Sequence, residues 1–320
     1  MSAVPGTADL HAARERLADR VRRTPLLEVD GAELGVRFPV VLKLELTQHT
    51  GSFKVRGALN SLLAAGRAGS AEGVVAASGG NHGAAVAWAA RSLGVGATVF
   101  VPATSPAAKI DRVRSFDADV RVVEGYYPAA AAAAAAWAEG RDVLSVPAYD
   151  GFDVVCGQAS LGLELLEQVP DAAHVVVGCG GGGLFAGVAL AGQGAWPVTP
   201  VEPAGCPTMH AALAAGRPVD VDVGGVAADS MGAPRIGRYA FAVARQMGTS
   251  SALVPGEQVD TARRWLWERC RVLAEPGGAV ALAGVMSGAV TLPAGAGTGP
   301  VVVVVSGGNT AGDSSTARQA

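Results

Sequence analysis

The sequence predicts an α/β protein made of two open, parallel-sheet domains. Short apolar runs typical of buried strands alternate along the chain with segments whose apolar residues have helical spacing. Strands that alternate with helices in this way form parallel sheets. The alternation comes in two series, so we expect a small domain of residues 43–146 inserted into a large domain of residues 1–42 and 147–320.

The composition indicates a globular protein whose partner is a small molecule. Of the 320 residues, 50% are hydrophobic and 17% are charged, so the chain can bury one large core or two moderate ones. The net charge is −3 and no block of Lys or Arg occurs, which argues against a nucleic-acid groove or a membrane-surface patch. We therefore expect neither nucleic acid nor a membrane as a partner.

The cysteines and the N-terminus predict a cytoplasmic protein. The four cysteines are far apart and form no Cys-x-x-Cys pair, which argues against a zinc site or a disulfide framework and fits a reducing compartment. Residues 1–10 lack the basic-then-apolar pattern of a signal peptide, and no apolar run reaches the ~18 residues of a membrane span.

The first series of elements follows an N-terminal helix. Apolar residues at helical spacing predict that helix over 8–21, and Thr24-Pro25 breaks the pattern before an extended piece. From Val40 we expect, in order, strand 40–46, helix 54–66, strand 73–77, helix 78–93, strand 97–102, helix 105–116 and strand 120–123. The alanine run 129–136 before Trp137 predicts a further helix, because alanine is the strongest helix former.

The second series begins after Pro147 and repeats the alternation. We expect helix 153–168, strand 174–177, helix 180–191, strand 198–202, helices near 207–215, 237–246 and 257–270, and strand 301–305. The Gly- and Ala-rich stretch 288–299 predicts a loop before the last strand.

Residues 47–58 contain a lysine in an unusual place. The strand from Val40 leads into Gly51-Ser52, which begin a helix whose first turn presents Lys54 next to Phe53. The positive end of a helix and an aromatic neighbour should lower the pKa of this lysine and make it a nucleophile towards an aldehyde. The alternative is an ordinary surface lysine, and this stretch alone does not exclude it.

Consecutive glycines follow the strand 174–177. They are Gly180, Gly181, Gly182 and Gly183, and Leu184 continues into a helix. A loop of this kind lets backbone N–H groups converge on an anion at a helix N-terminus, so a phosphate is the expected guest. The alternative is a tight turn that permits close packing, but glycines cost more chain entropy than such a turn requires.

Two more turns place polar groups after strands. In the first, Ser78-Gly79-Gly80-Asn81-His82, Asn81 can aim a donor at a ring oxygen, whereas His82 is more often structural than catalytic. In the second, Ser306 follows the strand 301–305, and ligands of parallel sheets collect at the carboxyl ends of strands. A hydroxyl that merely caps the turn is the alternative for Ser306.

Together, these motifs resemble fold-type II pyridoxal-phosphate enzymes of the serine/threonine dehydratase group, which includes serine racemase. The resemblance implies a tryptophan synthase β-like fold with pyridoxal 5′-phosphate in the cleft between the domains. It runs in family order through Thr24-Pro25-Leu26, Lys43-Leu44-Glu45, Thr50–Lys54, Ser78–Gly83, Gly180–Leu184, Val201-Glu202-Pro203, Glu275–Ala279 and Ser306–Asn309.

The resemblance assigns the cofactor contacts. It implies that Lys54 binds the cofactor covalently and acts as the catalytic residue, and that Phe53 packs beside the cofactor ring. It implies that Gly180–Leu184 hold the phosphate, that Asn81 bonds the ring hydroxyl and that Ser306 faces the pyridine nitrogen. A serine at that nitrogen, in place of a carboxylate, favours elimination over transamination.

The resemblance also implies the substrate and the reaction. Ser78, with Gly79, Asn81 and His82 in the same turn, receives the substrate carboxylate. The expected reaction is dehydration and deamination of a β-hydroxy L-amino acid, threonine or serine, to a 2-oxo acid and ammonia. Ser230 replaces a glycine of the family pattern, which leaves the substrate open, and a hydroxyaspartate- or arylserine-specific dehydratase is an alternative.

Other functions remain as alternatives. Serine racemases of this group use a serine immediately after the residue that matches Ser78, and this chain has Gly79 there. A cysteine synthase-like activity is disfavoured because Ser52–Gly57 resembles the dehydratases more closely. A rival from a different class is a catalytically silent binding protein that keeps the fold and the phosphate site.

The resemblance implies a cation site and a dimer as well. In metal-activated relatives the Glu of Val-Glu-Pro, a backbone carbonyl and an acidic side chain bind the ion, and these map to Glu202, the Cys206 carbonyl and Thr208. Because Thr208 supplies no charge, a divalent ion should bind weakly, and a monovalent ion or water is the alternative. A homodimer is the usual state of the group.

Overall fold

A six-stranded sheet forms the larger part of the protein. The computed structural model describes residues 3–67, 73–292 and 297–310. In spatial order the strands of this sheet are β1 (Leu26–Val29), β2 (Val40–Lys43), β10 (Val301–Val304), β7 (His174–Gly178), β8 (Val198–Pro203) and β9 (Ala252–Val254). All neighbours are parallel except β1, which pairs antiparallel with β2 at the edge.

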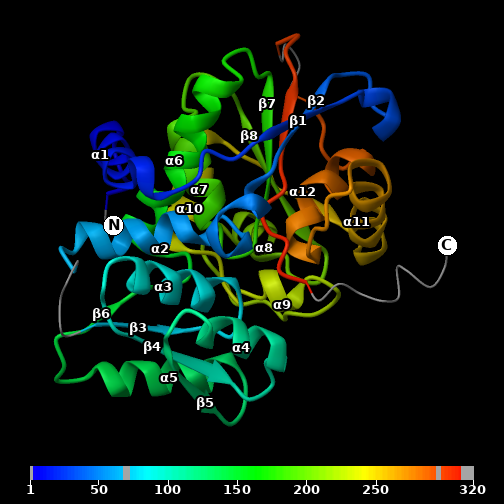
Figure 1. The fold of residues 1–320 in the computed structure, drawn as a ribbon. Helices are drawn as coiled ribbons and strands as arrows, with labels where there is room; N and C mark the ends of the chain where they lie inside the picture. Colours follow the sequence, from blue (N-terminus) through cyan, green and yellow to red (C-terminus); the bar gives the residue numbers. More distant parts are fainter. Residues whose placement is uncertain (1–2, 68–72, 293–296, 311–320) are drawn as a thin grey trace.

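A second sheet of four parallel strands lies below the first in Figure 1. Its strands, in spatial order, are β5 (Asp119–Val123), β4 (Ala97–Pro102), β3 (Val74–Ala77) and β6 (Leu144–Ser145). All four lie within the predicted small domain of residues 43–146. The α/β class with two parallel-strand sheets is thus confirmed, whereas the domain boundaries at residues 43 and 147 stay a prediction.

Helices cover both faces of the six-stranded sheet. One face carries α6 (Phe152–Gln168) and α7 (Gly183–Ala191), with α1 (Thr7–Leu17) and α10 (Arg238–Met247) outside them. The other carries α12 (Pro276–Met286) and α11 (Gly256–Cys270). The sheet is therefore the central layer of three, as expected for parallel strands. Two shorter helices complete this part: α8 (Thr208–Ala215) and α9 (Ala228–Met231).

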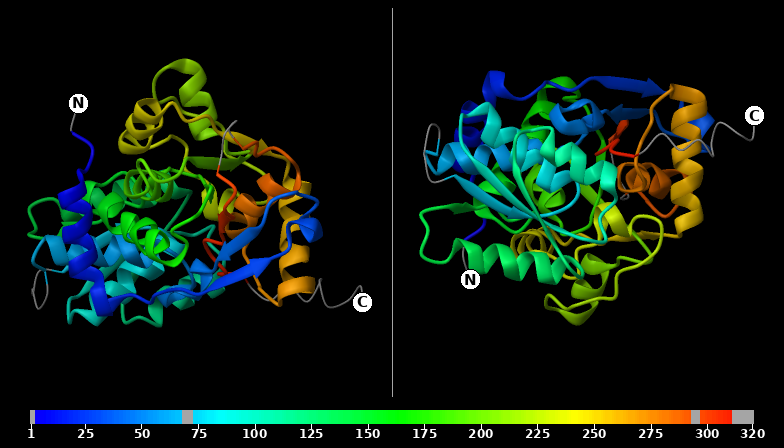
Figure 2. Two further views of the ribbon diagram at one scale, coloured as in Figure 1. Left: turned by 90° about the horizontal axis from the view of Figure 1, so that it is seen from above. Right: turned by 60° about the horizontal axis from the view of Figure 1, so that its bottom comes forward.

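The smaller sheet also has helices on two sides. Figure 2 shows α5 (Tyr127–Ala138) lying along it, and α3 (Asn81–Ser92) and α4 (Ala107–Arg114) cover the opposite side. Between the two sheets runs α2 (Lys54–Ala64), which packs on both α3 and α6. The short 3-10 helices are η1 (Ala18–Arg20), η2 (Gly31–Leu34), η3 (Glu45–Thr47) and η4 (His49–Gly51).

Strand β10 shows why the larger sheet must be covered on both faces. It consists entirely of valine, and every one of its residues is buried. Val302 and Val304 pack into the cluster under α6 and α7, while Val301 and Val303 pack into the cluster under α12. Alternate side chains of a strand point to opposite faces, so an all-valine strand fits only a sheet buried on both sides.

The differences from the predicted elements lie mostly where local signals are weak. Strand β9 and the helices α9 and α12 were not predicted from the sequence. The helices expected from 78 and 180 begin instead at Asn81 and Gly183, because the glycine-rich turns before them are not helical. The alanine-run helix is confirmed as α5, with Ala130 and Ala134 buried against the sheet. Residues 293–296 of the predicted loop lie outside the described part of the chain.

A group of buried charges joins α2 to the larger sheet. The Arg56 guanidinium, 1% exposed, donates to both Glu45 oxygens at 2.7 and 2.9 Å and to Glu164 Oε2 at 2.9 Å. Lys43, which is fully buried on β2, pairs with Glu164 as well. Two cations face two carboxylates, so the group is paired as buried charges require. These contacts of Arg56 hold α2 in place two residues after Lys54.

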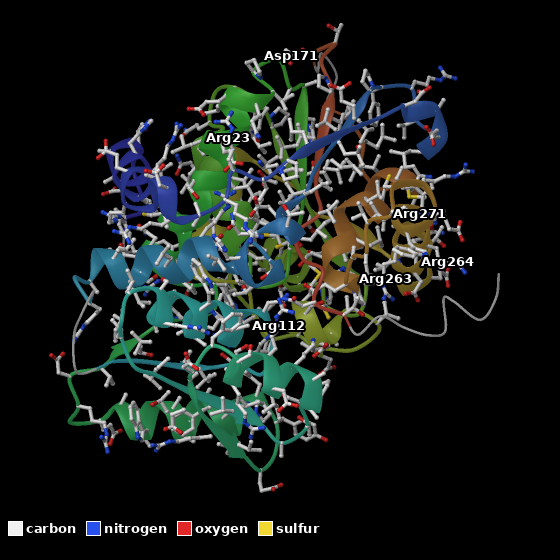
Figure 3. The ribbon with its side chains drawn as sticks, in the orientation of Figure 1. Arg23, Arg112, Asp171, Arg263, Arg264 and Arg271 are labelled. Carbon is white, nitrogen blue, oxygen red and sulfur yellow. The ribbon has the colours of Figure 1, made fainter. Side chains whose placement is uncertain are left out.

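Ion pairs on the surface contribute little to the stability of the fold. Arg23 lies beside α6 in Figure 3 and pairs with Glu167 at 2.8 Å, where both side chains are exposed. Exposed pairs of this kind contribute about 0–1 kcal/mol. Within the described residues, no helix is both long and apolar enough to cross a membrane.

Candidate active site

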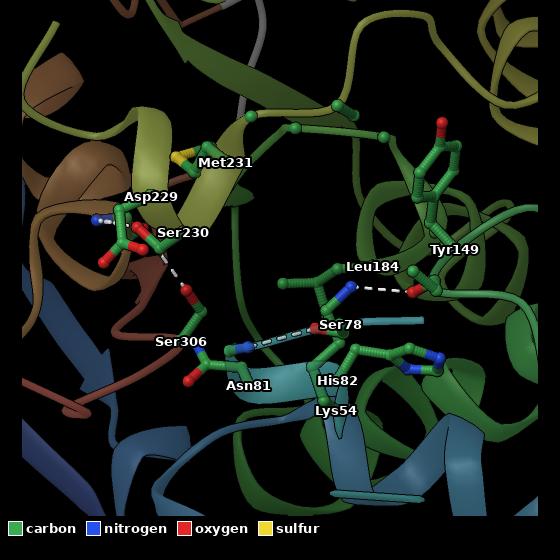
Figure 4. A pocket seen from close by; sticks show the side chains of 18 of the residues that line it. Lys54, Ser78, Asn81, His82, Tyr149, Leu184, Asp229, Ser230, Met231 and Ser306 are labelled. Atoms are coloured by element: carbon green, nitrogen blue, oxygen red, sulfur yellow. Dashed lines mark hydrogen bonds between the residues drawn. The ribbon is translucent and has the colours of Figure 1, made fainter. Parts of the chain in front are cut away.

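One cavity of about 250 Å³ brings together segments from both sheets. Figure 4 shows Lys54, Asn81 and Ser306 converging on it from separate elements. Its walls begin at the carboxyl ends of β3, β7 and β10, where parallel α/β sheets bind ligands. Every predicted cofactor and substrate residue lines it: Phe53, Lys54, Ser78, Gly79, Asn81, His82, Gly180, Gly181, Gly182, Gly183, Leu184 and Ser306.

Lys54 is the first residue of α2 and points into this cavity. Its Nζ donates to the Ala148 carbonyl at 2.7 Å and lies 5.2 Å from the centroid of the Phe53 ring. Burial lowers the pKa of Lys54 to about 8, against the opposing effect of the Glu275 charge. The lowered pKa expected from the sequence is present, and its largest cause is burial. About a tenth of the amine is therefore neutral at pH 7, far more than for an ordinary lysine.

Backbone contacts hold the segment before Lys54 against the end of β10. The Phe53 N–H donates to the Ser306 carbonyl at 3.1 Å, and Ser52 forms an antiparallel bridge with Gly307. The Ser306 hydroxyl is 7% exposed and donates to the Gly277 carbonyl at 3.4 Å, a long hydrogen bond. Lys54 and Ser306 are thus coupled through their backbones although 252 positions separate them.

The glycine turn after β7 presents N–H groups to the cavity. The Gly180 carbonyl accepts from Thr208 Oγ1 at 2.6 Å, and the Gly181 carbonyl accepts from the Gly237 N–H at 3.1 Å. Among the described residues, the N–H groups of Gly181, Gly182 and Gly183 find no acceptor in the protein. The Gly180 and Gly181 carbonyls are therefore hydrogen-bonded, whereas the N–H groups at the start of α7 are free. This arrangement is suited to binding an anion.

Close neighbours leave no room for side chains in this turn. A Cβ on Gly181 would overlap the ring of Tyr149, and one on Gly182 would lie 2.8 Å from Ile236 Cδ1. Gly182 also has a φ of +83°, which favours glycine. Tyr149 lines the cavity, at the right in Figure 4, and was not singled out from the sequence. No local signal around residue 149 indicates a site.

Asn81 is held at both ends of its amide. Its Nδ2 donates to Glu275 Oε1, and its Oδ1 accepts from Asn309 Nδ2 at 2.7 Å. Asn309 in turn is fixed by the Thr50 carbonyl at 2.7 Å. These contacts define which end of the amide is oxygen, and they leave Asn81 one N–H hydrogen to donate elsewhere.

Glu275 is a site residue that sequence reasoning missed. It precedes α12, is 3% exposed and lines the cavity. Burial raises its pKa to about 7, and the hydrogen bond from Asn81 acts in the opposite direction. The only signal was its membership of the Glu275–Ala279 motif, which gives no role for the carboxyl group.

His82 has a structural contact that explains its burial. It is 5% exposed, and its Nε2 lies 2.8 Å from the Val146 carbonyl, so this nitrogen carries the proton and donates. Burial, with a contribution from the Lys54 charge, lowers the pKa of His82 to about 3. His82 is therefore neutral over the physiological range, as expected for a structural histidine in the cavity wall.

The sequence of the chain matches a known protein family over most of its length. Residues 17–307 match the family described as "Pyridoxal-phosphate dependent enzyme". The chain belongs to this family. It is 38% identical to L-threonine ammonia-lyase of Geobacter sulfurreducens over 303 residues, which cover 94% of this chain and 74% of that protein.

Solved structures of this pyridoxal-phosphate enzyme family match over nearly the whole chain. Maize serine racemase has a TM-score of 0.91 at 28% identity, and the match covers 98% of this chain and 97% of that one. The threonine deaminase from T.th. has a TM-score of 0.86 at 33% identity, with coverage of 96% and 99%. The resemblance to the serine/threonine dehydratase group is thereby confirmed.

The residues of the cavity fit pyridoxal 5′-phosphate, the cofactor of the family. Lys54 supplies an amine of lowered pKa for the aldehyde, and Gly181–Gly183 supply free N–H donors for the phosphate. A phosphate can approach the backbone of this turn closely only if its residues have no Cβ, and a Cβ at Gly181, Gly182 or Gly183 would collide with its neighbours. The structure thus provides the two groups that such a cofactor demands in the wall of one cavity.

The predicted cation ligands are engaged with each other. The Glu202 carboxylate, fully buried, accepts from the N–H groups of Met209 at 2.6 Å and His210 at 2.9 Å. Its Oε1 also lies 3.1 Å from Thr208 Oγ1, the hydroxyl that donates to the Gly180 carbonyl. The Cys206 carbonyl accepts from the Thr208 N–H at 3.1 Å. Among the described residues no cluster of three His, Cys, Asp or Glu could hold a metal. The cation site therefore stays a prediction.

Proposed function

We propose that the protein is a pyridoxal-phosphate dependent ammonia-lyase that converts a β-hydroxy L-amino acid, threonine or serine, to a 2-oxo acid and ammonia. The observation that carries the proposal is the cavity in which Lys54 lies between a glycine-rich anion site and Ser306. The similarity to L-threonine ammonia-lyase supports the same reaction class. A silent binding protein would not need an amine of lowered pKa at this place.

Lys54 has two tasks in the proposed reaction. Its Nζ would hold the aldehyde of the cofactor, and as a free amine it would remove the α-proton of the substrate. When bound, the cofactor withdraws the electron pair that this proton leaves behind. A pKa of about 8 suits the second task, because the amine is partly neutral yet still basic enough to accept a proton.

The remaining residues hold and orient. Gly181, Gly182 and Gly183 bind the phosphate through their N–H groups, and Asn81 offers its remaining N–H hydrogen to the ring hydroxyl. Ser306 presents a neutral hydroxyl, so no protein charge stabilises a protonated ring nitrogen, which favours prompt loss of the β-hydroxyl. Loss of water gives an enamine that takes up water again on hydrolysis, so the net products of threonine are 2-oxobutanoate and ammonia.

A substrate panel tests this proposal. The purified holoenzyme is incubated with L-threonine, L-serine, threo-3-hydroxyaspartate and threo-phenylserine, and 2-oxo acid and ammonia are measured together. We expect equal amounts of the two products from L-threonine or L-serine, with Lys54→Ala as the inactive control. If only hydroxyaspartate or phenylserine reacts, one of the specific dehydratase alternatives is correct; if none reacts, the proposal fails.

Serine racemase is the second candidate, because maize serine racemase matches the fold closely. Racemisation needs a second proton donor on the face of the substrate opposite Lys54, and Gly79 contributes no side chain. We therefore expect little D-serine. Chiral chromatography of the L-serine reaction decides the matter, since D-serine that accumulates as fast as pyruvate would identify a racemase.

Location and assembly complete the proposal. A cytoplasmic homodimer is expected from the cysteine pattern and from the resemblance. Sedimentation of the purified holoenzyme at micromolar concentration checks the second point, and a monomer at all concentrations would contradict it.

A further inference from the structure

Ser105 fills the space that a side chain at residue 79 would need. It lies in the turn between β4 and α4, and its N–H donates to the Pro102 carbonyl at 2.9 Å. A Cβ built on Gly79 would overlap Ser105 Oγ and lie 2.7 Å from Ser105 Cβ and 2.8 Å from Val101 Cγ1. The hydroxyl of Ser105 therefore lies directly against the Cα of Gly79.

This hydroxyl is available to a ligand. Ser105 is half-buried and lines the same cavity as Lys54. Among the described residues its Oγ has no hydrogen-bond partner. A serine hydroxyl can donate one hydrogen bond, and an unused donor in a cavity wall is suited to an acceptor on the ligand.

The surrounding wall is built to receive an anion with neutral donors. Residues 78–80 lead into α3, a helix of twelve residues whose first N–H groups have no intrahelical acceptor. Ser78 Oγ accepts from the Gly80 N–H at 3.1 Å, which leaves its own hydrogen free to donate. Lys54 is the only Lys or Arg among the described residues that line the cavity, and it serves the cofactor.

We propose that the Ser105 hydroxyl donates a hydrogen bond to the α-carboxylate of the substrate, together with Ser78 and the N-terminus of α3. The inference rests on the proposed function in one respect, namely that the ligand is an amino acid. A carboxylate is an acceptor-only group, so it satisfies the three kinds of donor at once. Ser105 is then a specificity-determining residue contributed by a turn that the sequence analysis did not single out.

Binding of unreactive ligands tests the assignment apart from turnover. L-Alanine keeps the carboxylate but has no β-hydroxyl to lose, and 2-aminopropane has a methyl group in place of the carboxylate. Their dissociation constants are measured on the holoenzyme from the change in cofactor absorbance. We expect Ser105→Ala to weaken L-alanine about tenfold or more, as for a hydrogen bond to a charged group, and to leave 2-aminopropane unchanged.

Thr104→Ala is the matched control, because Thr104 lies in the same turn, is exposed and does not line the cavity. It should change neither affinity. Unchanged L-alanine binding in Ser105→Ala would overturn the inference, and so would equal weakening of both ligands. A wild-type enzyme that binds L-alanine through Ser105 but forms no 2-oxo acid would refute the proposed function alone.

Kinetics give a second readout. If Ser105 binds the carboxylate equally in the ground state and the transition state, Ser105→Ala should raise KM for L-threonine and change kcat far less. A fall in kcat without a change in KM would contradict a role in substrate binding.

The shared space also makes positions 79 and 105 interdependent. Gly79→Ala should weaken L-alanine binding in the natural chain, where the new Cβ collides with Ser105, and should do so less in a Ser105→Gly background. Equal effects in the two backgrounds would show that the positions are independent. For the same reason, a racemase test with Gly79→Ser is informative only when Ser105 is replaced by glycine as well.

Discussion

Two glycine-rich turns face the cavity, and each connects a buried strand to a helix. The turn Gly180–Gly183 lies in the larger sheet unit and offers only backbone, with its carbonyls bound by Thr208 and Gly237 and its N–H groups free. The turn Ser78–Gly83 lies in the smaller unit and offers side chains as well. The same kind of turn is therefore proposed for two purposes, phosphate binding through the backbone at Gly180–Gly183 and substrate recognition through side chains at Ser78–Gly83.

The two turns also differ in what holds them. The first is fixed by elements of its own sheet unit, α8 and the start of α10. The second depends on contacts across the cavity, because Asn81 is held by Glu275 and Asn309, and Lys109 of α4 pairs with Asp229 of α9. The turn Gly180–Gly183 is thus held by its own sheet unit, whereas the turn Ser78–Gly83 is held by contacts between the two units.

Removing the amine of Lys54, which lines the same cavity as the two turns, should have the largest effect. Lys54→Ala should lower turnover by about a thousandfold or more, because it removes both the covalent anchor and the base. Ammonia release is the measurement, and circular dichroism should show an intact fold. Borohydride should fix the cofactor to the natural chain and leave the variant unlabelled. Substantial ammonia production by the variant would contradict the assignment.

The second largest effect should come from a side chain placed in the turn Gly180–Gly183. Gly181→Val should weaken cofactor affinity by about a hundredfold, because the Cβ overlaps the Tyr149 ring and its branches block access to the free N–H groups. Titration of the apoenzyme with pyridoxal 5′-phosphate measures this. Gly96→Ala is the control, since a Cβ there meets nothing within 4 Å. Equal affinity in the natural and Gly181→Val proteins would remove the phosphate role.

The lowered pKa of Lys54 predicts a pH effect of about tenfold. Only the neutral amine attacks an aldehyde, so the rate at which the apoenzyme captures the cofactor should rise with pH through a midpoint of about 8. Between pH 7 and pH 9 the neutral share rises about tenfold for such a group. Stopped-flow absorbance gives the rate, and a midpoint above 10 would show an ordinary lysine.

The smallest effect should come from removing the charge of Glu275, which contacts Asn81 across the cavity. The charge of Glu275 raises the pKa of Lys54, so Glu275→Gln, which keeps an acceptor for Asn81, should move the midpoint of cofactor capture to lower pH. Glu268→Gln, on α11 and outside the cavity lining, is the control. An unchanged midpoint would mean that the carboxyl group carries no charge near Lys54.

Sequence patterns of short range determined much of this protein. Short apolar runs that alternate with segments of helical spacing predicted the parallel α/β class, and strand 97–102 was predicted with the bounds that the structure has. Glycines after a strand and a lysine at a helix start are local signals, so Lys54, Gly180–Gly183 and Ser306 were identified before the cavity was known. The family resemblance added their roles, and those roles stay predictions until the variants are measured.

Only the tertiary structure identified the partners of these residues. Glu275 meets Asn81 across 194 positions of sequence, Asn309 meets it across 228, and Ser105 fills the place next to Gly79 from another turn. The structure also shows that Glu202, which the resemblance implies as a cation ligand, accepts from N–H groups at the start of α8. Such contacts have no local signature, because they depend on how two sheets are packed and not on the chemistry of neighbouring residues.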